Sequence, residues 1–160
     1  MKILFLTHLN NTDKIQNDYM NDSLLHGLRE LYGSNVVDYP GAWYMYKDEV
    51  IKRKFNYSNL WGNGFTYYDQ LKNFDQIDRS NIKEKIKSNY FDYVIYGSFP
   101  RSQIFLEDVK KSKSKIILVD GEDNQDLSKN TDLNLIYFKR ELNQNVKNVY
   151  PINLSIPKKK

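Results

Sequence analysis

Three carboxylates stand within four residues in the segment Asp120-Gly121-Glu122-Asp123, directly after the apolar run at 116–119. Carboxylate oxygens bind Mg²⁺ or Mn²⁺, and they also accept hydrogen bonds from sugar hydroxyls. The spacing is not that of an EF-hand loop, so a metal is only one interpretation. The other is structural: Asp120 caps the next turn, Gly121 permits a sharp bend, and Glu122 and Asp123 face water.

Basic and hydroxyl side chains follow two other apolar segments. Ser98 and Arg101 come after the segment at 91–97, and Lys139 and Arg140 come after the segment at 133–138. An arginine guanidinium binds a phosphate or carboxylate through two parallel hydrogen bonds. Arg101, Lys139 and Arg140 are therefore candidates for contact with an anionic group. The alternative for Lys139 and Arg140 is an internal ion pair with the acidic loop.

The two histidines are the candidate general bases. His8 follows the first apolar run, at 3–6, and His26 lies beside the apolar stripe of a predicted helix. Asp22 stands four residues before His26, so the two side chains share one helical face and can form a base oriented by a carboxylate. The alternative for His26 is an ordinary packed or half-exposed side chain. His8, His26 and Asp22 are thus the candidate catalytic residues.

Short apolar runs alternate with helical patterns, which is typical of a parallel sheet with crossover helices. We expect an α/β fold with an open, doubly wound, mostly parallel, Rossmann-like sheet of five to six strands. The expected strands are 2–7, 35–39, 91–97, 115–120, 133–138 and 148–152, and the expected helices are 18–32, 82–90 and 100–111.

In such a sheet the carboxyl ends of the strands share one edge, where ligands of open α/β folds bind. This edge is predicted to gather the polar side chains that follow the strands. The candidate ligand-binding residues are Ser98, Arg101, Asp120, Glu122, Asp123, Lys139 and Arg140. The alternative is that strand ends are polar only because they meet solvent.

The segment 40–78 is rich in aromatic residues and shows no sustained period of two or 3.6, so we predict an insertion. It covers one side of the core, or it stacks on sugar rings or bases, or it forms a surface for a protein partner. Gly62-Asn63-Gly64 within it predicts a tight turn.

The length of 160 residues predicts a single domain at 1–157, followed by a disordered lysine tail at 158–160. The formal charge of +4 includes three charges from that tail, and acidic and basic residues are interspersed elsewhere, so no nucleic-acid partner is expected. The absence of cysteine and of an apolar leader or membrane span predicts a cytoplasmic protein with no membrane partner.

The segment 8–18 contains no glycine, which excludes a dinucleotide fingerprint or a Walker A loop there.

Several segments together resemble the amino-terminal region of bacterial and phage glycosyltransferase-like proteins, including the CgeB-like or spore-maturation-like group. They lie at 18–29, 44–48, 62–66, 120–123 and 137–142. The resemblance implies a GT-B arrangement, in which two Rossmann-like domains face each other across a cleft. In that arrangement the amino-terminal domain mostly shapes the acceptor side and the other domain holds most of the nucleotide-sugar donor.

The 160 residues leave no room for a second domain of comparable size, so we expect either one half of a larger assembly or a free-standing relative. Our first hypothesis is a glycosyltransferase-like domain that binds a sugar or nucleotide-sugar-related ligand, with a partner domain or as a homo-oligomer. The second is a non-catalytic interaction module that uses the aromatic insertion. The third is a metal-dependent phosphate-processing enzyme built on the acidic loop.

Overall fold

The protein is built on one six-stranded sheet in which every strand pair is parallel. Our computed structural model describes residues 1–8, 18–56, 58, 60, 67–127, 135–143 and 145–153. The strands are β1 (Ile3–Leu6), β2 (Val36–Tyr39), β3 (Tyr93–Tyr96), β4 (Lys115–Asp120), β5 (Leu135–Lys139) and β6 (Val149–Pro151). Their order is β2-β1-β3-β4-β5-β6, so the predicted open, Rossmann-like α/β fold is confirmed.

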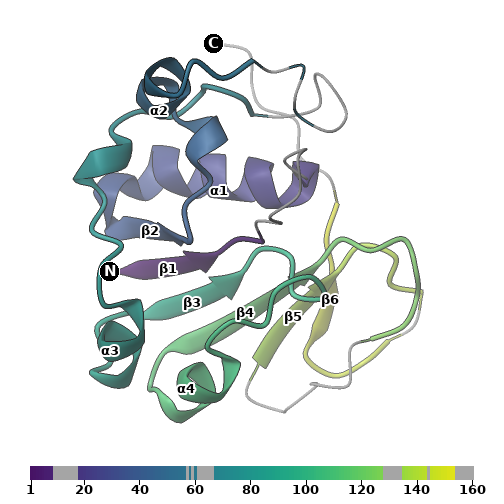
Figure 1. The fold of residues 1–160 in the computed structure, drawn as a ribbon. Helices are drawn as coiled ribbons and strands as arrows, with labels where there is room; N and C mark the ends of the chain where they lie inside the picture. Colours follow the sequence, from purple (N-terminus) through teal and green to yellow (C-terminus); the bar gives the residue numbers. More distant parts are fainter. Residues whose placement is uncertain are drawn as a thin grey trace.

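Four α-helices are found among the described residues: α1 (Tyr19–Tyr32), α2 (Lys47–Lys52), α3 (Ile82–Lys87) and α4 (Leu106–Lys111). Figure 1 shows α1 on one side of the sheet and α3 and α4 on the other. A strand covered on both faces is apolar at every position, and all four residues of β1 are indeed buried. No helix in the described part of the chain is long and apolar enough to cross a membrane.

The helix predicted at 100–111 was too long at its start. Only Leu106–Lys111 is α-helical. The Arg101 N–H donates to the Ser98 carbonyl at 3.1 Å, closing a turn, and Phe105 has a positive φ of 61°, which interrupts any helix reaching back to Pro100. Similarly, the helix predicted at 82–90 ends at Lys87.

The described residues of the aromatic segment 40–78 pack against α1 and β2, as the covering interpretation predicted. Tyr44, Tyr46 and Tyr67 are buried in the main core. The Tyr44 hydroxyl donates to Asp22 of α1 at 2.7 Å, and the Tyr46 hydroxyl donates to Asp38 of β2 at 2.9 Å. The predicted turn at 62–64 and the predicted tail at 158–160 lie outside the described residues.

Candidate functional site

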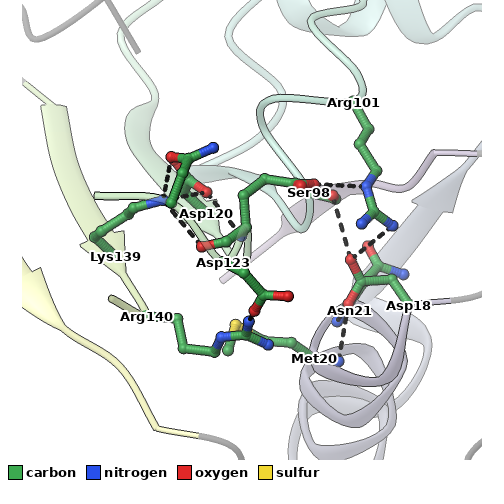
Figure 2. A network of polar contacts seen from close by, with 11 residues as sticks. Asp18, Met20, Asn21, Ser98, Arg101, Asp120, Asp123, Lys139 and Arg140 are labelled. Atoms are coloured by element: carbon green, nitrogen blue, oxygen red, sulfur yellow. Dashed lines mark hydrogen bonds and ion pairs between the residues drawn. The ribbon is translucent and has the colours of Figure 1, made fainter. Parts of the chain in front are cut away.

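Figure 2 shows that side chains at the carboxyl ends of β3, β4 and β5 lie close to side chains at the start of α1. His8 lies just beyond β1, Ser98 and Arg101 follow β3, and the acidic loop follows β4. Lys139 ends β5, and Arg140 comes next. We call the set His8, Asp18, Ser98, Arg101 and Glu122 the edge cluster.

Arg101 contacts both carboxylates of the edge cluster. Its Nε donates to Glu122 Oε1 at 2.7 Å, and one terminal nitrogen lies 3.3 Å from Asp18 Oδ2. The side chain is 40% exposed. The two carboxylates therefore hold the guanidinium in place while its remaining N–H groups stay accessible, which is the arrangement that suits capture of an oxygen ligand.

Asp18 is a member of this cluster that the sequence analysis did not select. It is the N-cap of α1, and its Oδ1 accepts hydrogen bonds from the N–H groups of Met20 and Asn21. The Ser98 hydroxyl donates to the other oxygen at 3.4 Å. An aspartate at the predicted start of a helix is a capping signal, and a helix that follows the first strand begins at the carboxyl edge. Those two facts together place Asp18 at the site.

His8 is the one cluster member without a hydrogen bond. It is only 4% exposed, and neither ring nitrogen has a hydrogen-bond partner in the part of the chain that the structure describes. Burial lowers its pKa, and the Arg101 charge adds to this effect, whereas Asp18 and Glu122 oppose it. The imidazole is therefore predominantly neutral at pH 7, with one nitrogen as donor and the other as acceptor.

A buried ion pair lies next to the edge cluster. Lys139 Nζ donates to Asp120 Oδ1 at 3.0 Å, and both side chains are at most 2% exposed. Asp120 Oδ2 accepts from the Tyr137 hydroxyl at 2.6 Å, and Lys139 also reaches the Glu122 carbonyl and Asn124. The candidate ligand-binding residues Asp120 and Lys139 therefore bind each other, and together they hold the loop that carries Glu122.

Each carboxylate of the acidic loop is paired with a different cation. Asp120 pairs with Lys139, Glu122 with Arg101, and Asp123 with Arg140, whose Nε also lies 3.3 Å from Glu141. The internal pairing that we considered for Lys139 and Arg140 is thus the arrangement found. Among the described residues, no group of three or more acidic or histidine side chains is placed to hold a metal ion. All three carboxylates of the acidic loop are therefore engaged by basic side chains.

The other two candidate catalytic residues lie within α1, outside the edge cluster. Asp22 is fully buried, and its Oδ1 accepts from the Tyr44 hydroxyl and from Asn21 Nδ2, whereas its Oδ2 accepts no hydrogen bond. Burial raises the pKa of Asp22 to about 7. The His26 ring packs at a tilt against the Tyr67 ring, with 5.0 Å between ring centroids. Asp22 and His26 thus both contact the aromatic segment.

Gly97 sets how closely α1 approaches the sheet below the edge cluster. A Cβ atom at this position would lie 2.2 Å from Asn21 Oδ1 and 2.4 Å from the Phe5 ring. Gly97→Ala is therefore expected to destabilise the protein by about 1–3 kcal/mol, because the buried start of α1 must shift. Urea unfolding of Gly97→Ala measures this, with Gly27→Ala as the control, since a Cβ there meets nothing within 4 Å. Equal stability of the two variants would contradict the close contact.

Searches of protein-family models, curated proteins and solved structures find no significant match to this chain.

Proposed function

We propose that this domain binds a sugar or a nucleotide-sugar-related ligand at the carboxyl edge of its sheet, with His8 in contact with a ligand hydroxyl. The observation that carries the proposal is the buried His8 imidazole with two unused ring nitrogens. Buried polar groups almost always have hydrogen-bond partners. The two unpartnered His8 nitrogens lie at the carboxyl edge of the sheet, where open α/β folds bind ligands, so they support a hydrogen-bonding ligand at this edge.

The chemistry of the neutral imidazole favours a hydroxyl group as that partner. A hydroxyl both donates and accepts, and His8 offers one acceptor and one donor. The carboxylates of Asp18 and Glu122 add acceptors for neighbouring hydroxyls, and the accessible N–H groups of Arg101 suit an anionic group of the ligand. The resemblance to glycosyltransferase-like proteins points to the same ligand class.

His8 is also the best-placed base if the assembled protein carries out transfer. A base must be unprotonated at the working pH and close to the proton it takes, and the lowered pKa of His8 meets the first condition. The proposed role is removal of a proton from an acceptor hydroxyl, with Arg101 positioned for developing negative charge. In the GT-B arrangement a partner domain would supply the rest of the donor site.

The rival functions have less support. The aromatic segment, which would be the surface of an interaction module, buries Tyr44, Tyr46 and Tyr67 in the core. The acidic loop, which would hold the metal of a phosphate-processing enzyme, has each of its carboxylates in an ion pair.

Thermal-shift measurements with UDP- and GDP-sugars, with and without Mn²⁺, test the proposal. A ligand present at 100 times its dissociation constant stabilises the folded state by about 2.7 kcal/mol, which raises Tm by several degrees. His8→Phe should lose this shift because the ring keeps its volume but has no hydrogen-bonding atom. Lys87→Gln, on the exposed surface of α3, is the control and should keep it. No shift with any of these compounds, or an equal shift in His8→Phe, contradicts the proposal.

A further inference from the structure

We propose that the protein has a second binding site, for a small carboxylate- or phosphate-bearing anion, in a cavity at the other end of α1. This site does not depend on the function proposed above. The edge cluster includes the N-cap of the 14-residue helix and the cavity lies at its last turn, so the helix separates them by about 20 Å.

The cavity lies between the carboxyl end of α1 and the segment 70–77. Its volume is about 520 Å³, within the usual range of roughly 300–1,000 Å³ for small-molecule sites. Its lining is mostly polar and includes the cations Arg29 and Lys72, the Ser34 hydroxyl and the amides of Gln70 and Gln76. Such a lining suits a small hydrogen-bonding ligand and not an apolar one.

Arg29 makes the cavity an anion site. One terminal nitrogen donates to the carbonyls of Gly33 and Val36, at 2.6 and 3.2 Å, while the buried Nε has no acceptor within the described ranges. Among the described residues, no carboxylate forms an ion pair with Arg29, and the nearby Asp38 pairs with Arg79. A partly buried guanidinium without a counter-charge is unfavourable, so an anion from solution would complete its environment.

The surrounding charges agree with this assignment. Lys72 lines the same cavity, and Glu30 is the only acidic residue among the described residues that line it, which gives this lining an excess of positive charge. The carbonyl end of α1 carries partial negative charge, but Arg29 covers it through its bond to the Gly33 carbonyl. The cavity therefore favours an anion over a neutral or cationic ligand.

Two-dimensional NMR titration of the whole chain with inorganic phosphate and, separately, with succinate tests this site. We expect backbone amide shifts at Ser34, Gln70 and Gln76. A response to phosphate alone assigns a phosphate-bearing ligand, and a response to succinate alone assigns a carboxylate-bearing one. Arg29→Gln should weaken binding about tenfold or more, because a charged hydrogen-bonding partner is lost. Lys113→Gln makes the same charge change to a lysine in a different cavity and should bind as the unmodified chain does.

Because Arg29 also caps the helix, a second variant keeps the test decisive. Ser34→Trp fills the cavity from an exposed position without changing any charge, and it should abolish the shifts. The proposal is overturned if neither anion causes shifts, if the shifts occur instead around Lys113 or Arg101, or if Ser34→Trp still binds an anion that the unmodified chain binds.

Discussion

Asp22→Asn is expected to remove a large part of the pH dependence of stability. The pKa of Asp22 is raised by burial from 3.8 to about 7, so between these values the folded state holds a proton that the unfolded state has released. The free energy of unfolding therefore falls as the pH rises from about 4 to 7, and the loss is complete above the folded pKa. Asparagine keeps the acceptor for the Tyr44 hydroxyl but cannot ionise.

Urea unfolding at pH 5 and pH 8 measures the effect. Between these pH values the unmodified protein should lose about 2–3 kcal/mol more stability than Asp22→Asn, because a change of one in the pKa corresponds to roughly 1.4 kcal/mol of unfolding free energy. Taking the difference between the two proteins removes the contribution of His8, whose lowered pKa acts in the opposite direction. Parallel pH profiles for the two proteins would show that Asp22 ionises normally in the folded state.

Arg79→Met is expected to cost about 3–5 kcal/mol, because it leaves the carboxylate of Asp38 buried without its counter-charge. Arg79 donates to Asp38 Oδ1 at 2.6 Å, to the Asp38 carbonyl at 2.8 Å and to the Phe74 carbonyl at 2.8 Å. Its guanidinium also stacks 3.8 Å from the Phe74 ring centroid. This one side chain joins the end of β2 to the aromatic segment.

Two comparisons separate the cost of leaving the Asp38 carboxylate unpaired from the cost of removing any arginine side chain. Arg53→Met, within the aromatic segment, removes a half-exposed partner of the buried Glu49, which keeps Lys52 at 2.8 Å as its other cation, so it should cost less than Arg79→Met. Adding Asp38→Asn to Arg79→Met should recover part of the loss, since no unpaired charge is then left. Urea unfolding gives all three values. If Arg79→Met is no more harmful than Arg53→Met, the buried pair contributes little.

The sequence was informative where one local pattern decides the outcome. The continuous apolar runs at β1 and β4 predict strands covered on both faces, and their alternation with helices predicts the parallel order that places His8, Ser98, Arg101 and the acidic loop at one edge. The start of α1 at Asp18 also follows from local capping chemistry.

Contacts between distant segments could not be predicted in the same way. The Asp38–Arg79 pair spans 41 residues, and the bond from Tyr44 to Asp22 depends on how the aromatic segment folds back on α1. The late start of α4 depends on the backbone of Phe105, a residue type that rarely adopts positive φ, so nothing in the sequence indicates it. Such features are set by the tertiary structure and not by local preference.

The most direct test of a ligand at the carboxyl edge is the NMR signal of the His8 imidazole during titration with UDP- and GDP-sugars. We expect a sugar compound that binds to shift the His8 ring resonances together with the backbone amides of Ser98 and Arg101. The His8 ring should remain neutral at pH 7 throughout. Binding that leaves the His8 ring unchanged, or a His8 ring that is already protonated at pH 7, would contradict the account.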